Sequence, residues 1–177
     1  LLILTTPSAA VVTVTEKTTY FTVRGTSLQA LDRDLKRAGP IDSRTGERTP
    51  AATTITLLPY AAYVPSPRSC HVTSESVSLR FEYIKPRWSP SARPDASTRT
   101  VFNALENDIR RFQTEQTRIA KSEARKLERA LRNLKPARDC ATMEAAFNRT
   151  AAGILKAHQD RQRAFIKRWG QGFKARM

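Results

Sequence analysis

The chain has 177 residues, with 31 Lys and Arg against 16 Asp and Glu, and therefore carries a net charge of +15 with an isoelectric point near 10.7. Its length suits one domain with a single core, and no stretch reaches the ~20 apolar residues that a transmembrane helix needs. The charge favours polyanionic partners such as nucleic acid, anionic lipid or acidic envelope glycans, while two histidines are too few for a His-rich metal site.

The first ten residues have the pattern of the end of a secretory signal peptide. Leu1–Leu4 is apolar and lacks a starting Met, and Ser8 and Ala10 occupy the small-residue positions of a cleavage site. The alternative is an ordinary first strand. We expect residues 1–10 to be a signal-peptide remnant, residues 11–177 to form one domain, and the protein to be secreted or periplasmic.

The first half of the domain, residues 11–85, has the pattern of a sheet with one short helix. Thr18–Arg24 is dominated by β-branched and aromatic residues, which is typical of a strand. In the following segment Thr26 and Gln29 have the spacing of a capping box, and Gly39 followed by Pro ends the predicted helix.

Two further strands are predicted before the helical half. Ala51–Val64 contains Pro59, which favours an edge position, a bulge or a break. Cys70–Tyr83 alternates between apolar and polar residues, as a half-buried antiparallel strand does. Its apolar face consists of Val77, Leu79, Phe81 and Tyr83. Three prolines then predict an irregular strap over 86–97.

The second half, residues 98–170, predicts two long helices. In Thr98–Leu134 one apolar stripe repeats at helical spacing, with a single polar gap at Gln116. The members of the stripe are Leu105, Ile109, Phe112, Ile119, Leu127, Leu131 and Leu134. Because only four residues, 135–138, follow, the next helix must run back antiparallel.

That second helix is predicted to begin at Asp139, a favourable N-cap residue, and to end at Gly170 and Gly172. Its apolar stripe consists of Met143, Phe147, Ala151, Ile154, His158, Phe165 and Trp169. The sequence therefore predicts an α+β fold, in which a small, mainly antiparallel sheet with one short helix packs against a long antiparallel two-helix hairpin.

Few residues suggest chemistry. The two cysteines, Cys70 and Cys140, form no CxxC motif, and an even pair far apart in sequence suits one disulfide. A Cys/His metal site that adds His71 is the alternative. His158 lies on an apolar stripe and is interpreted as a core histidine, and Glu123 is expected to pair with a neighbouring basic residue. The chain has no GxSxG, Walker or GxGxxG motif.

The order of these features resembles that of a known family. The features are the strand Tyr20–Gly25, the helix end Ala38-Gly39-Pro40, the Ala-Thr strand near residue 52, Cys70, the triplet Pro86-Arg87-Trp88, the long helix, the pair Asp139-Cys140 and the second helix. Over residues 18–172 this succession resembles the bacterial domain-of-unknown-function family described as predicted secreted zinc-dependent proteases. The resemblance implies a Cys70–Cys140 disulfide and a helical His-Glu-x-x-His zinc site.

At the positions of that motif this chain differs. The family's second His stands three residues before an Ile-Ala pair, which here is Ile119-Ala120, so Gln116 occupies its place. Phe112 and Gln113 then stand where the first His and the Glu belong, and the pentapeptide reads Phe-Gln-Thr-Glu-Gln. Phe cannot bind a metal, an amide is a poor zinc ligand, and Gln cannot act as a base near neutral pH.

The sequence thus predicts no catalytic residue, no metal ligand and no cofactor, although zinc belongs to the family. The family's C-terminal His-Gly is also replaced, since this chain has Trp169-Gly170. We expect a secreted or periplasmic, non-catalytic domain whose partner is an anionic envelope polymer or a protein. Two alternatives stay open: an active zinc-dependent protease with unidentified ligands, and a basic nucleic-acid-binding protein, although aromatics interleaved with basic residues are not evident.

Overall fold

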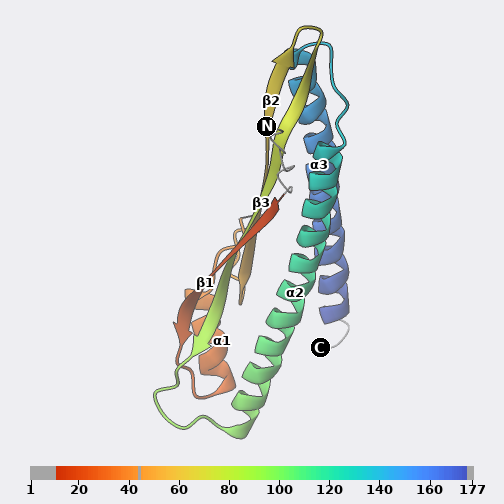
Figure 1. Ribbon diagram of the computed structural model, residues 1–177. Coiled ribbons are helices and arrows are strands. Elements are labelled where there is room, and N and C mark those ends of the chain that lie inside the picture. Colours follow the sequence, from red (N-terminus) through yellow and green to blue (C-terminus); the bar gives the residue numbers. More distant parts are fainter. Residues whose placement is uncertain (1–10, 44, 175–177) are drawn as a thin grey trace. The chain divides into compact units, whose positions relative to one another are not determined.

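The computed structural model describes residues 11–43 and 45–174, so the predicted signal-peptide remnant lies outside the described residues. Six elements follow one another along the chain (Figure 1): β1 (Val11–Val23), α1 (Leu28–Ala38), β2 (Ala52–Ser66), β3 (Ser69–Trp88), α2 (Ala96–Arg132) and α3 (Cys140–Lys174). A three-stranded sheet packs against helices, and α2 and α3 contact each other. The predicted α+β class is confirmed.

The sheet is mixed, with strand order β1-β3-β2. β2 and β3 form an antiparallel hairpin across a two-residue turn at 67–68, and β1 runs parallel to β3 (Figure 1). Parallel neighbours need a long connection, and here α1 and β2 together form it. Pro59 lies in β2, which is an edge strand, as the sequence predicted.

The predicted strap over 86–97 is wrong at its start, because β3 continues through Pro86 to Trp88. β3 has 20 residues and β2 has 15, so the end of β3 extends past the first residue of β2. The N–H of Ser89 donates to the carbonyl of Val23 in β1 at 2.9 Å. In a strand the backbone N–H groups of successive residues point to opposite neighbours. Since the N–H of Ser89 points to β1, the nitrogen of Pro86 points to the other side, where β2 does not extend, and no hydrogen bond is lost.

The chain divides into two compact units, each of which contains parts of the sheet and of α2. Unit 1 contains the start of β1, Thr56–Leu79 and the chain from Arg118 onward. Unit 2 contains Glu16–Ile55 and Arg80–Thr117. The prediction of one domain over residues 11–177 stays a prediction.

Unit 2 is built around a small apolar cluster. Val23, Leu31 and Phe102 are buried together, and the Trp88 ring lies 4.9 Å from that of Phe102. The indole Nε1–H of Trp88 donates to the carbonyl of Gly25 at 2.9 Å. A β-carbon at Gly25 would lie 2.2 Å from the backbone nitrogen of Leu31, so this close approach of strand end to helix requires glycine.

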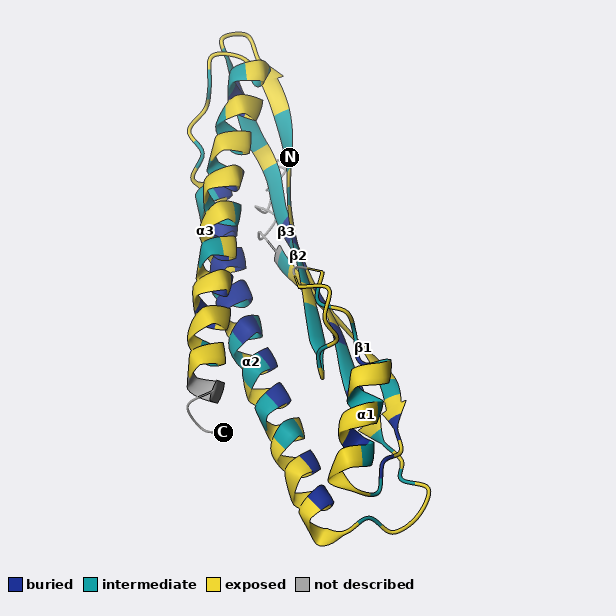
Figure 2. Ribbon diagram, turned by 180° about the vertical axis from the view of Figure 1, so that it is seen from behind, coloured by how far each residue is buried: buried dark blue, intermediate teal, exposed yellow. Residues whose placement is uncertain are grey.

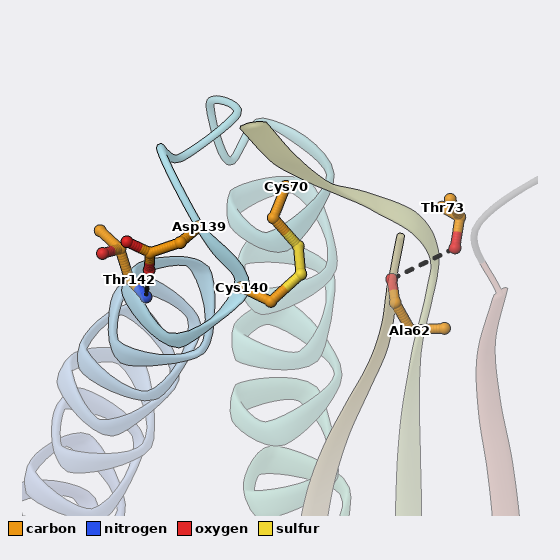
Figure 3. The surroundings of a disulfide bond; sticks show 6 residues. All are labelled: Ala62, Cys70, Thr73, Asp139, Cys140 and Thr142. Carbon is orange, nitrogen blue, oxygen red and sulfur yellow. Dashed lines mark hydrogen bonds between the residues drawn. A yellow bond between two sulfur atoms is a disulfide. The ribbon is translucent and has the colours of Figure 1, made fainter. Parts of the chain in front are cut away.

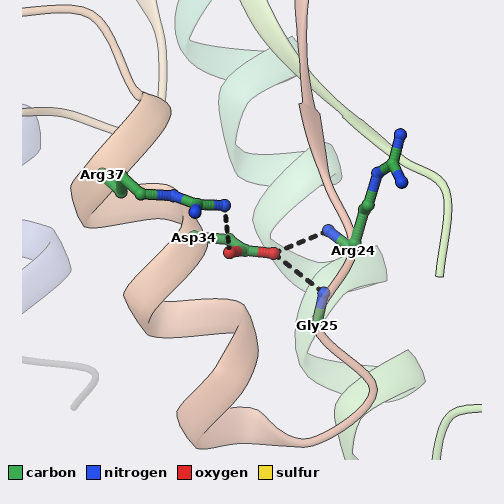
Figure 4. A network of polar contacts seen from close by, with 4 residues as sticks. All are labelled: Arg24, Gly25, Asp34 and Arg37. Atoms are coloured by element: carbon green, nitrogen blue, oxygen red, sulfur yellow. Dashed lines mark hydrogen bonds and ion pairs between the residues drawn. The ribbon is translucent and has the colours of Figure 1, made fainter. Parts of the chain in front are cut away.

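Helix α1 begins one residue later than predicted. Its N-cap is Ser27, whose hydroxyl accepts the N–H of Ala30 at 3.3 Å, and the predicted cap Thr26 instead accepts the N–H of Asp95 through its carbonyl. Asp34 ties the helix to the end of β1 (Figure 4). Its carboxylate accepts the N–H groups of Arg24 at 2.7 Å and Gly25 at 3.0 Å.

Unit 1 contains the contact between the two long helices. The predicted stripes contribute to its core from Ile119 of α2 onward, and Figure 2 shows buried residues recurring along one side of each long helix. Fully buried members are Leu127, Leu131 and Met143, together with Val77 and Leu79 of β3. Helix α3 continues through Gly170 and Gly172 to Lys174, so the predicted end was wrong. A helical glycine costs only ~1 kcal/mol, which packing elsewhere on a helix of this length offsets.

A disulfide joins Cys70 of β3 to Cys140 at the start of α3 (Figure 3), as predicted. The backbone of Cys70 also exchanges two hydrogen bonds with Ala137, at 2.7 and 2.9 Å. Asp139 caps α3 as expected, since its carboxylate accepts the N–H of Thr142 at 2.7 Å. None of the helices in the described residues is long and apolar enough to cross a membrane.

Candidate functional site

The three positions that the resemblance assigns to a zinc motif, 112, 113 and 116, lie on α2 in unit 2. Gln113 is 4 % exposed and Gln116 is 5 % exposed, while Phe112 is half-buried. The sequence predicted that Gln116 turns inward, but it did not predict the burial of Gln113, which lies outside the apolar stripe. Neither amide atom of Gln113 has a hydrogen-bond partner among the described residues.

A pair of hydroxyl groups extends this polar face. Thr117 lies one helical turn after Gln113, and its hydroxyl hydrogen-bonds to the Tyr83 hydroxyl of β3 at 2.8 Å. Burial raises the pKa of Tyr83, the bond to Thr117 lowers it, and the charge of Glu16 raises it again, so the net shift is upward. The phenol therefore stays protonated at neutral pH. Tyr83, Gln113, Gln116 and Thr117 form what we term the α2 polar cluster.

The α2 polar cluster does not fit a zinc ion. A catalytic zinc needs about three protein ligands drawn from His, Cys, Asp and Glu, together with a water. The cluster contains two amides and two hydroxyl groups, and across residues 11–43 and 45–174 no three His, Cys, Asp or Glu residues are grouped so that they could hold a metal ion. The cluster can donate and accept hydrogen bonds, but none of its groups is a base or an activated nucleophile.

A second set of polar residues lies between α2 and α3 in unit 1. Glu123 of α2 is 1 % exposed and pairs with Lys126 at 2.9 Å and with Arg161 of α3. Burial alone would raise the pKa of Glu123, but the hydrogen bonds and charges of the two cations outweigh it and hold the pKa below its usual value. The predicted salt bridge of Glu123 is confirmed, and it crosses between the helices.

His158 of α3 belongs to the same region and is buried, as its place on the apolar stripe predicted. Its Nδ1 has no hydrogen-bond partner among the described residues. Burial lowers the pKa of His158, Glu123 opposes this shift and Arg161 adds to it. The imidazole is therefore neutral near pH 7, in the same region as the ion-paired carboxylate of Glu123.

The alternative Cys/His metal site is wrong. Both Cys70 and Cys140 are in the disulfide, so their sulfur atoms are not available as thiolate ligands beside His71.

Three comparisons with known proteins bear on identity. Residues 18–172 match the family described as bacterial protein of unknown function (DUF922). No curated protein and no solved structure matches the chain significantly.

Proposed function

Since the chain belongs to this bacterial family of unknown function, DUF922, we propose that it is a non-catalytic, zinc-protease-like member of the family that acts through binding. The matched residues extend from 18 to 172 and include every element on which the resemblance rests. The zinc-protease character comes from that resemblance, and the loss of the zinc site comes from the residues of this chain.

One observation carries the proposal: the burial of two uncharged amides where a zinc site would need ligands and a base. Gln113 and Gln116 are on the inner side of α2, and the resemblance assigns to them the Glu and the second His of a helical zinc motif. An amide at either position neither ionises nor binds zinc strongly. Phe112 adds apolar surface at the position of the first ligand.

Two features support a place outside the cytoplasm. A disulfide persists in oxidising compartments and is uncommon in cytosolic proteins. The first ten residues also have the composition of a signal-peptide end. In such a compartment, a chain with a net charge of +15 would meet anionic envelope polymers as well as protein partners.

Metal analysis tests the proposal against its enzyme alternative. Protein purified with its disulfide intact should contain far less than one zinc per chain, and peptide cleavage should not respond to chelators. One tightly bound zinc, together with cleavage that a chelator abolishes and zinc restores, would overturn the proposal. It would then favour an active protease that uses other ligands, and His158→Ala would test the buried histidine as one of them.

A further inference from the structure

The exposed side of α2 in unit 1 carries a row of cations. Between Arg118 and Arg132 there are six Lys or Arg and two Glu. At 100° per residue five of the cations fall within about a quarter of the helix circumference. They are Arg118, Lys121, Arg125, Arg129 and Arg132, which we term the α2 cationic stripe.

The acids of this segment do not lie on the stripe. Glu123 is 1 % exposed and points toward α3, where it pairs with Arg161. Glu128 is buried and pairs with Arg132 at the end of the stripe, and Arg132 also pairs with Glu75 of β3 at 3.4 Å. At the centre of the stripe Arg125 and Arg129 are exposed, and neither is in an ion pair within the described chain. Since they lie one turn apart, their like charges repel. A bound polyanion would remove this repulsion.

From this arrangement we propose that the α2 cationic stripe binds a linear anionic polysaccharide. The inference extends the proposed binding function by naming the surface and the class of partner. The stripe spans 14 residue steps of helix, or about 21 Å, and places a Lys or Arg side chain roughly every 5–6 Å along one line. That geometry suits a flexible chain with regularly repeated sulfate or carboxylate groups, because each turn of the helix can meet a separate anion.

The composition of the segment favours a polysaccharide over nucleic acid. Arg118–Asn133 contains no Phe, Tyr or Trp, so bases have no ring to stack on. The disulfide between Cys70 and Cys140 in the same unit suits an oxidising compartment, where anionic glycans are abundant. Exposed arginines in water still attract any polyanion, so the experiment must compare the two classes directly.

The test uses heparin fragments as the polysaccharide and single-stranded oligo(dT) of equal charge as the nucleic acid. Affinity is measured at low salt for the wild type and for Arg125→Glu/Arg129→Glu. The control is Arg33→Glu/Arg93→Glu, which makes the same change in net charge at two exposed arginines of unit 2. A milder variant, Arg125→Gln/Arg129→Gln, guards against misfolding, and circular dichroism checks every variant.

The stripe variant should lose heparin affinity by ~10-fold or more, the Gln variant by ~3-fold or more, and the control by less than ~2-fold. Binding by the wild type should disappear near ~1 M salt. The inference is overturned if the wild type does not bind heparin, if the control weakens as much as the stripe variant, or if oligo(dT) binds more tightly than heparin. None of these results depends on zinc content, so the proposed loss of the metal site is judged separately.

Discussion

The disulfide gives the clearest quantitative prediction for the stability of unit 1. Cys70 and Cys140 are 70 residues apart in sequence, so the cross-link closes a long loop in the unfolded chain. In the chain-entropy description, a loop of this length stabilises the folded protein by about 4 kcal/mol. The double variant Cys70→Ala/Cys140→Ala should therefore lose about that much free energy of unfolding.

The folded unit should survive the change. Cys70 and Ala137 keep their reciprocal backbone hydrogen bonds, and Asp139 still caps α3 through the N–H of Thr142. Alanine is suitable at the fully buried Cys70 position because it introduces no hydroxyl that would need a partner. The circular dichroism spectrum of the variant should thus match that of the wild type.

Urea unfolding measures the effect. Trp169 lies in unit 1 and Trp88 in unit 2, so Trp88→Phe leaves Trp169 as the only tryptophan reporter. In that background the midpoint should fall by ~2 M urea if the slope is about 2 kcal/mol/M. Wild-type protein reduced with a thiol should unfold at nearly the same concentration as the alanine variant. A loss below ~1 kcal/mol would refute the reasoning, since the cross-link would then contribute little to folding.

Two further predictions concern other parts of the chain. Asp34→Ala should destabilise unit 2 by about 1–3 kcal/mol, because the N–H groups of Arg24 and Gly25 lose their acceptor. The control Asp32→Ala removes only the exposed ion pair with Lys36 and should cost less than ~0.5 kcal/mol in the same thermal or urea scan. His158 has a lowered pKa in the folded state, so its contribution to stability is present above pH ~6.5 and is lost as pH falls toward the folded pKa. In His158→Gln the dependence of stability on pH between ~7 and ~5 should therefore be weaker than in the wild type. An unchanged dependence would contradict the burial argument.

The sequence predicted the observed helices and strands correctly where local periodicity decides the structure. The apolar stripes that end at Leu134 and begin at Met143 predicted two antiparallel helices, because the predicted four-residue connection leaves no other path. The alternation from Val77 to Tyr83 identified the inward face of β3 in the same way. These patterns depend only on which residues face the core.

The errors occurred where a distant segment decides the local structure. Pro86 remains in a strand because β2 does not extend beside it. Thr26 is not the N-cap of α1, and its carbonyl accepts the N–H of the distant residue Asp95 in place of a helical N–H. No local signal predicts either partner. The pairing of Glu123 with Arg161 depends likewise on how α2 and α3 align, which the helical period of each does not specify.

The candidate site was only half predictable. Gln116 interrupts an apolar stripe, so its inward orientation follows from helical spacing. Gln113 lies three residues earlier and is not a member of the stripe, but it is one helical turn before Thr117, which hydrogen-bonds to Tyr83 of β3 in unit 2. Gln113 lies four residues after the buried Ile109, so a wider inward face that includes the i+4 position of each buried residue would have identified it.

The most direct test of the proposed loss of a metal site is to introduce the zinc motif at these positions. The triple variant Phe112→His, Gln113→Glu, Gln116→His places two imidazoles one helical turn apart with a carboxylate between them. Zinc titration by calorimetry should show no binding to the wild type and measurable zinc affinity in the triple variant. A wild type that binds one zinc tightly would contradict the loss of the site, and a folded triple variant that ignores zinc would contradict the assignment of the motif to residues 112–116.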